Sequence, residues 1–448
     1  MNWLSKLLKS MGHEPAVVRW DSLLADASSR NGYVRERAVT AIARTGRDDG
    51  LAVLLTRAND WVSEVRQAAQ AGVGLYLTNT HLGAWGRSLE QVSALQRAGR
   101  ADHSGLLRQI RAYLSTSSNL QALRLHNPSP TVEVARLLFS LELDIPGSDA
   151  DRFGQLNEAV RGTDILTASL AISSILRLPQ ELQIELAGAA CGSPFAPIRA
   201  RGLCAAVGLG GPALRQLIFR MCSDKSPGVR GVALKEIGPE QALLEMQMRE
   251  IYRSAPSTAS RAVALDVLCA LGVADAGTLC LNAVSDVSSL VRGVAAAHRF
   301  KVAVPVERDQ LVVEILRDPS ARVRRIALLW VQKGCQAPDV ETLLQLAQGR
   351  PAVFASLARV ATHLSPWARL EFLLALATIN QKDPILTKAL HGEVEIWCAD
   401  MPRCFVTPSD QQSGVIRRYW AGLRDEFIVD LQKQMGFQLR QYGVLARH

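Results

Sequence analysis

The dipeptide Val-Arg recurs along this chain at an almost constant interval. It occupies residues 34–35, 65–66, 229–230, 291–292 and 323–324, and Ile198-Arg199 and Ser260-Arg261 keep the same phase. From residue 198 onward the steps are 31, 31, 31 and 32 residues, and the long gap from 65 to 198 divides evenly at Val132 and near Ile165. A period of this length predicts a stack of repeated structural units.

Each repeated site is followed by small or apolar residues at offsets that fit an α-helix. After Val34 these are Ala38, Ala41 and Ile42, which lie four, seven and eight positions further on. Such offsets share one stripe of a helix, whereas a strand would alternate with a period of two. A second apolar segment precedes each site, and the aspartate between them predicts a turn that starts the next helix. These aspartates are Asp60, Asp224, Asp286 and Asp318.

The pattern Asp-x4-Val-Arg-x3-Ala-x2-Ala/Val-Leu resembles the HEAT repeat, an armadillo-like helical repeat. The likeness is to its short bacterial form, which is similar to the repeats of phycobilisome-lyase-like proteins. The resemblance covers roughly residues 25 to 365 and is poor between about 78 and 190. It implies an all-α fold, namely a right-handed α-solenoid of about ten or eleven HEAT-like helix pairs.

The HEAT resemblance also implies that the recurring Asp and Arg residues pair within and between neighbouring repeats as a buried ladder. A guanidinium can donate to turn carbonyls and to a carboxylate at the same time. We therefore expect these residues to stabilise the stack and not to form a binding site. The ladder residues are Arg35, Asp60, Arg66, Arg199, Asp224, Arg230, Arg261, Asp286, Arg292, Asp318 and Arg324.

The sequence predicts three segments: an amphipathic helix over 1–14, the repeats over 15–380 with an irregular part at 78–190, and a helical cap over 381–448. The first helix either covers the end of the first repeat or contacts a membrane surface. The cap is rich in aromatic residues, and the helical spacing from Ile416 to Leu431 predicts one long final helix. The apolar face of the first helix comprises Trp3, Leu4, Leu7, Leu8 and Met11.

Composition restricts the function further. The formal net charge is +9, but the excess of basic residues lies at the two ends and forms no continuous stripe of the kind that grips nucleic acid. No apolar run reaches the length of a membrane span. The eight cysteines are scattered, which predicts a reduced, cytoplasmic protein without a disulfide framework or a metal site. We expect no cofactor.

The sequence favours a non-catalytic scaffold that binds a protein partner through the concave surface of the solenoid. It contains no Gly-rich phosphate loop, nucleophile elbow or HExxH string, and it indicates no small-molecule substrate. Polar residues beside the ladder have no evident structural role and are therefore the candidate partner surface. They are Arg37, Glu64, Arg201, Arg322 and Arg325.

Two alternatives stay open. A HEAT-like DNA glycosylase of the alkylation-repair type would need aromatic residues and a carboxylate on a basic surface, for which Asp60, Trp61 and Trp330 are candidates. A membrane-recruited adaptor would depend on residues 1–11. A deoxyhypusine hydroxylase is excluded, because such an enzyme needs several His-Glu pairs as metal ligands and the chain has one such dipeptide, His13-Glu14. For a bilin lyase, no residue pattern marks a chromophore site.

Overall fold

The structure is a computed structural model that describes residues 19–379, 384–424 and 427–446. Over these residues the chain is all-α, and no strand occurs among them, which confirms the predicted fold class. The chain divides into two compact units, residues 1–214 and 215–448. The predicted N-terminal amphipathic helix falls outside the described residues.

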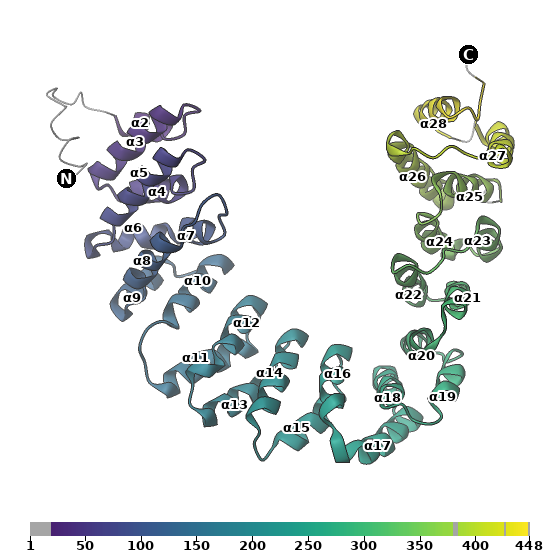
Figure 1. Ribbon diagram of the computed structural model, residues 1–448, viewed down its shortest axis with the longest axis horizontal. Helices are drawn as coiled ribbons and strands as arrows, with labels where there is room; N and C mark the ends of the chain where they lie inside the picture. Colours follow the sequence, from purple (N-terminus) through teal and green to yellow (C-terminus); the bar gives the residue numbers. More distant parts are fainter. Residues whose placement is uncertain (1–18, 380–383, 425–426, 447–448) are drawn as a thin grey trace. The chain divides into compact units, whose positions relative to one another are not determined.

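Unit 1 is a series of short helices that stack on one another (Figure 1). Helix α3 packs against α5, α11 against α12, α12 against α14, and α13 against α14. The helices are α2 (Trp20–Asp26), α3 (Gly32–Thr45), α4 (Gly50–Arg57), α5 (Ser63–Leu75), α6 (Leu82–Arg87), α7 (Leu89–Gln96), α8 (Ser104–Leu114), α9 (Ser117–His126), α10 (Val132–Glu142), α11 (Asp149–Arg161), α12 (Ile165–Ser173), α13 (Gln180–Ala190) and α14 (Ala196–Leu209), with 3-10 turns η1 (Asn79–His81) and η2 (Ile175–Arg177).

Unit 2 shows the same principle with more regular pairs. The second helices of consecutive repeats stack directly, α18 on α20, α20 on α22, and α22 on α24. Of these, α20 and α22 carry the Val-Arg dipeptides 291–292 and 323–324. The helices are α15 (Leu214–Met221), α16 (Pro227–Glu236), α17 (Gln241–Ser254), α18 (Thr258–Leu271), α19 (Ala276–Ala283), α20 (Ser289–Val302), α21 (Pro305–Leu316), α22 (Ala321–Gln332), α23 (Val340–Ala347), α24 (Phe354–Ala361), α25 (Pro366–Ile379), α26 (Pro384–Asp400), α27 (Asp410–Leu423) and α28 (Val429–Gln441), with 3-10 turns η3 (Gly238–Glu240), η4 (Pro351–Val353) and η5 (Met401–Arg403).

Helices α10 and α12 begin within two residues of the places that the period gives them, although Val132 and Ile165, unlike Val65 and Val291, are exposed. In the irregular stretch, α10 starts at Val132 and α12 at Ile165, the two positions at which the long gap divides evenly. Asp164 caps α12, because its carboxylate accepts a hydrogen bond from the Thr167 N–H. The period therefore continues through the part of the chain in which the Val-Arg dipeptide is lost.

Small residues allow the stacked helices to approach closely. A Cβ atom added at Gly72 in α5 would lie 2.8 Å from the Cβ atom of Ala43 in α3, and one at Gly202 in α14 would lie 2.7 Å from the Cβ atom of Ala190 in α13. Both distances are shorter than any normal carbon contact, so glycine is required there. One cluster of buried apolar residues runs from Leu23 to Leu141 in unit 1, and the contact at Gly72 lies within it.

The C-terminal segment differs from the prediction of one long final helix. The chain forms two helices, α27 and α28, and the backbone at Ile428 is extended where α28 begins. The apolar residues on which the prediction rested are nevertheless all buried, because α27 packs on α25 and α28 packs on α26. They are Ile416, Trp420, Leu423, Phe427 and Leu431.

Candidate functional site

Several of the recurring arginines join two turns of the stack. In unit 1, Arg35 Nη1 donates to the carbonyls of Ser29 and Arg30 in the turn before its own helix. Its Nε and Nη2 donate to the two carboxylate oxygens of Asp60, in the turn before the next stacked helix, at 3.0 and 2.7 Å. Asp60 in turn accepts from the Val62 N–H. One guanidinium therefore fixes both ends of a repeat.

Unit 2 repeats this geometry. Arg261 donates to both carboxylate oxygens of Asp286 at 2.9 and 3.1 Å, and Arg292 to both of Asp318 at 2.7 and 2.9 Å. Asp286 and Asp318 each accept from the backbone N–H two residues further on, as Asp60 does. Arg292 also donates to the carbonyls of the preceding turn. The Arg-Asp pairs that repeat this geometry are called rungs below.

Several ladder residues deviate from the expected pairing. Arg66 donates to the carbonyls of Asp60 and Trp61 in the turn before its own helix, and the segment after α5, residues 76–81, contains no aspartate. Arg230 bonds Asp266 in the middle of α18 because position 255, where a turn aspartate would stand, is an alanine. Arg324 donates to the Ser356 hydroxyl at 3.0 Å and to the Ala352 carbonyl.

The remaining ladder positions keep the local part of the pattern. Arg199 is buried and donates to the carbonyls of Ser193 and Pro194 in its own turn. The Asp224 carboxylate accepts from the Ser226 N–H, and its carbonyl accepts from Arg230. Asp224 therefore lies in the turn before α16, and Arg199, in the first turn of α14, donates to the turn before its helix.

Arg-carboxylate pairs also occur outside the Val-Arg pattern, and Arg249 of α17, for example, donates to both carboxylate oxygens of Asp275. Arg136 in α10 donates to both carboxylate oxygens of Asp164, at 3.0 and 2.6 Å, within the irregular stretch. Arg369 in α25 donates to Glu393 in α26 at 3.0 Å. None of these arginines follows a Val in phase, so the Val-Arg pattern gave no signal for them. An aspartate directly before the phase position Ile165 was the available clue to the Arg136–Asp164 pair.

The ladder is poorly suited to bind a partner. The side chains of Arg35 and Asp60 are 3 and 1% exposed, so each satisfies the other away from water. Burial alone would raise the pKa of Asp60, but the hydrogen bonds from Arg35 and from the Val62 N–H outweigh it and lower the pKa. The same balance lowers the pKa of Asp318 beside Arg292. The Arg35–Asp60 pair is therefore closed to a ligand, whereas Arg292 and Asp318 line a pocket of about 390 Å³.

The five residues of the candidate partner surface are all exposed to solvent. Arg37 and Glu64 are exposed in unit 1, and Arg322 and Arg325 are exposed in the first turns of α22 in unit 2. Arg201 is also exposed, but its guanidinium already donates to Ser169 and to the Ser173 hydroxyl. The structure therefore leaves the first four accessible, while a contact with Arg201 would compete with bonds inside the protein.

Two adjoining pockets lie in the irregular stretch of unit 1, between α9, α10 and α11. One has a volume of about 570 Å³ and the other of about 700 Å³. The first is lined by Leu120, Leu125, Ile145 and Arg152 among others, and the second by Pro128, Pro130, Leu138 and Phe139 among others. They share three lining residues, and together they are called the α9–α11 pockets below. The shared residues are Arg124, Glu142 and Gln155.

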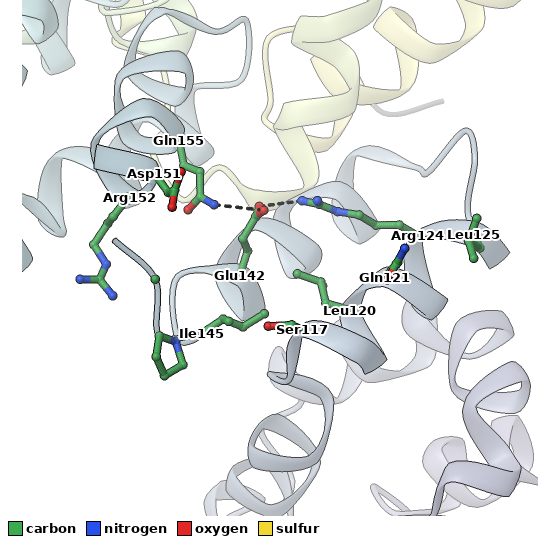
Figure 2. Close-up of a pocket in the computed structure, with 12 residues that line it drawn as sticks. Ser117, Leu120, Gln121, Arg124, Leu125, Glu142, Ile145, Asp151, Arg152 and Gln155 are labelled. Atoms are coloured by element: carbon green, nitrogen blue, oxygen red, sulfur yellow. Dashed lines mark hydrogen bonds and ion pairs between the residues drawn. The ribbon is translucent and has the colours of Figure 1, made fainter. Parts of the chain in front are cut away.

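A polar bridge is formed by the three residues that line both pockets. The carboxylate of Glu142, at the end of α10, accepts from Arg124 of α9 at 2.6 Å and from Gln155 of α11 at 3.3 Å. Figure 2 shows both donors pointing at Glu142 from opposite sides. Apolar surface lies on either side of this neutralised bridge, so each pocket offers apolar contact with hydrogen-bonding groups at its edge.

The pockets exist because the stack is interrupted there. Helix α10 packs against α7, α9 and α12, whereas α11 packs mainly against α12 and α13. The main apolar cluster of unit 1 correspondingly extends no further than Leu141 and its partly buried neighbour Ile145. Because α10 and α11 do not bury a common apolar face, the space between them stays open to solvent. The spacing of the repeat could not reveal this, since the period is kept.

The residues considered for DNA repair are engaged elsewhere. Asp60 is bound by Arg35, and Trp330 of unit 2 is 6% exposed and stacks on Phe300 with ring centroids 4.0 Å apart. Trp61 is 67% exposed and lies 5.1 Å from the Arg35 guanidinium. Only Trp61 of these three could therefore contact a base without a rearrangement.

The described part of the chain holds neither a metal-binding cluster nor a membrane-spanning helix. No group of three or more His, Cys, Asp or Glu side chains there could hold a metal ion. Among the described helices, none has the length and apolar character that crossing a membrane requires. The candidate membrane face, Trp3, Leu4, Leu7, Leu8 and Met11, belongs to the residues that are not described, so its role stays a prediction.

Comparison with known proteins adds no assignment: no family model matches the chain, and no curated protein matches it at a significant level.

Proposed function

We propose that the protein is a non-catalytic scaffold of HEAT-like repeats that binds a protein partner, and that the α9–α11 pockets of unit 1 receive an extended segment of that partner. The observation that carries this proposal is the pair of adjoining pockets between α9, α10 and α11. Insertions and irregularities in a repeat protein commonly carry its binding function.

The chemistry of the pockets suits a peptide. Each has the volume of a small binding site, and the two share one polar bridge. Alternate side chains of an extended peptide could enter the two pockets, while Arg124, Gln121 and Gln155 offer hydrogen-bonding groups to its backbone. Leu125, at 77% exposed, would lose its contact with water when a partner binds.

The concave surface of the solenoid, predicted from the sequence, is proposed as a further part of the partner surface. The exposed side chains of Arg37, Glu64, Arg322 and Arg325 support it. We also propose that the protein acts in the cytoplasm, because scattered cysteines without a disulfide framework are typical of that compartment.

The test places a photoreactive amino acid at residue 125 of the full-length protein in its native host. Irradiation should crosslink a defined protein to position 125, and excess unmodified protein should reduce the yield. Residue 176 is the matched control, because Leu176 is also a leucine of unit 1, is 81% exposed and lines neither pocket. Identical products at both positions would contradict the proposed site.

Nucleic-acid binding is distinguished by a separate titration. Duplex and single-stranded DNA are added to the purified protein at two salt concentrations. We expect weak binding, because the basic excess forms no continuous stripe. Tight binding that falls steeply with salt would overturn the proposed function and favour the DNA-binding alternative.

A further inference from the structure

Two cysteines of unit 2 face each other across a helix pair. Cys269 lies in the last turn of α18 and Cys280 lies in α19, and their sulfur atoms are 3.3 Å apart. Cys280 is 4% exposed within an apolar cluster that includes Leu265, and Cys269 is half-buried at its edge. The connection between the two helices is a short turn that contains Gly272 at φ 70°. The sequence separation of eleven residues had suggested no relation between the two thiols.

The surroundings of the pair lower the pKa of one thiol and raise the pKa of the other. The two sulfurs share a hydrogen bond in which either can donate, and this contact, together with the nearby His298 and Arg299 side chains, lowers the pKa of Cys280 to about 7. The shared proton and burial raise the pKa of Cys269. Tyr252 and Asp275 also face the pair, and Asp266 lies one turn from Cys269.

Other buried cysteines of unit 2 have the opposite character. Burial raises the pKa of Cys222 to about 11 and that of Cys398 to about 12, so both stay protonated at neutral pH. The thiolate is the reactive form of cysteine. Cys280 is therefore the buried cysteine of unit 2 that combines thiolate character with a second thiol in contact.

We propose that Cys269 and Cys280 form an oxidation site, in which a small hydroperoxide converts the two thiols into an intrachain disulfide that links α18 to α19. The Cys280 thiolate attacks one peroxide oxygen, the O–O bond breaks, and after protonation a sulfenic acid and one water (for hydrogen peroxide) result. The Cys269 sulfur then attacks the sulfenic sulfur, the S–O bond breaks, and a second water leaves with the Cys269 proton. Two thiols are oxidised and one peroxide is reduced to two waters.

The geometry selects the oxidant and the product. A peroxide of nearly the size of water can reach a sulfur in an almost closed site, whereas a bulky disulfide such as oxidised glutathione cannot approach Cys280 without opening the helix pair. The contact between the sulfurs means that the sulfenic acid forms next to the thiol that resolves it. This inference concerns unit 2 and does not depend on partner binding at the α9–α11 pockets.

The bond would act next to an unusual rung of the ladder. Asp266, one helical turn before Cys269, supplies the carboxylate for Arg230 and also accepts from His298 at 2.7 Å. Linking α18 to α19 would restrict the helix that holds this carboxylate between α16 and α20. The oxidised form should therefore resist unfolding in unit 2 more than the reduced form does, because the crosslink constrains the unfolded chain.

The test uses the purified full-length protein and one equivalent of hydrogen peroxide. Trypsin cleaves after Arg261 and Arg292, so both cysteines lie in the single peptide 262–292. We expect this peptide to lose two hydrogens in mass and to resist alkylation, and a dithiol reductant should restore both properties. Oxidised glutathione at the same concentration should act at least about tenfold more slowly, since exposure limits it.

Two serine variants assign the roles. Cys280→Ser should abolish the disulfide and slow peroxide consumption about tenfold or more, because the thiolate is lost. Cys222→Ser, which removes another buried cysteine, should leave both unchanged. The proposal is overturned if peptide 262–292 keeps two alkylatable thiols while the exposed Cys204 is oxidised, or if the peptide gains oxygen and keeps a free Cys269 thiol. Both readouts come from the wild-type protein and hold even if a variant fails to fold.

Discussion

Two Arg-Asp pairs of unit 1 have the same bidentate geometry and opposite surroundings. Arg35 and Asp60 are 3 and 1% exposed, whereas Arg136 and Asp164 are 32 and 28% exposed. The first pair fixes two turns deep in the stack, and Arg35 also satisfies two turn carbonyls. In the second pair, the Asp164 carboxylate accepts hydrogen bonds both from Arg136 and from the Thr167 N–H in the first turn of α12. The comparison teaches that one motif serves packing where it is buried and helix initiation where water reaches it.

The largest expected effect comes from Asp60→Ala, which leaves the buried Arg35 charge without its partner. We expect the free energy of unfolding to fall by about 3–5 kcal/mol. Urea unfolding followed by circular dichroism measures this. The double variant Arg35→Met, Asp60→Leu is the control, because replacing both charges by apolar groups should recover most of the loss. A loss below about 1 kcal/mol in the single variant would show that this pair behaves like a surface ion pair.

A smaller effect is expected for Asp164→Ala, because its site is accessible to water. Loss of the α12 cap should cost about 1–2 kcal/mol. Asp164→Asn should cost less, since an amide oxygen can still accept from the Thr167 N–H. The same urea assay tests both variants. If Asp164→Ala lowered the free energy of unfolding as much as Asp60→Ala does, the two pairs would contribute equally to stability, against this prediction.

Lowering the pH should reduce the contribution of both pairs to the free energy of unfolding. The Arg136 guanidinium holds the pKa of Asp164 well below its usual range, and the pKa values of Asp60 and Asp318 are also lowered. A carboxyl whose folded pKa is lowered stabilises the fold above its unfolded value near ~4 and loses that contribution as the pH falls. Unfolding free energies measured from pH 6 to 3 should therefore decrease, and they should decrease less in Asp164→Asn.

The smallest effect on stability is expected for Glu142→Gln at the bridge between the pockets. The amide can still accept from Arg124, and the pair is partly exposed, so the unfolding free energy should change by less than about 1 kcal/mol. The crosslinking yield at position 125 should nevertheless change, because the bridge forms the edge of both pockets. Thermal unfolding and crosslinking of the same preparation separate the two effects. A large decrease in the unfolding free energy would mean that Glu142 stabilises the fold as strongly as the buried Arg-Asp pairs do.

The sequence predicted the parts of the fold that depend on periodic residues. The starts of α10 at Val132 and α12 at Ile165 follow from the even division of one gap, because the repeat length is set by stacking and not by any one side chain. The turn aspartates were visible for a similar reason, since a helix start needs an acceptor at a fixed place.

Other features depend on contacts that no spacing encodes. Asp266 replaces a turn aspartate from the middle of a helix, and Cys269 meets Cys280 only because a short turn folds α19 back on α18. The α9–α11 pockets arise where α10 and α11 fail to share an apolar face, although each has one of its own. The extended backbone at Ile428 interrupts a spacing that fits a single helix.

The register of the ladder also restricts how the length of this chain can change. Arg292 lies 26 residues before Asp318, and a few residues inserted between them would separate the guanidinium from its carboxylate. Duplicating a whole period adds one arginine and one aspartate together, and every pair stays complete. Chains of this type can therefore be lengthened or shortened by about 31 residues at a time, the step of the Val-Arg dipeptide.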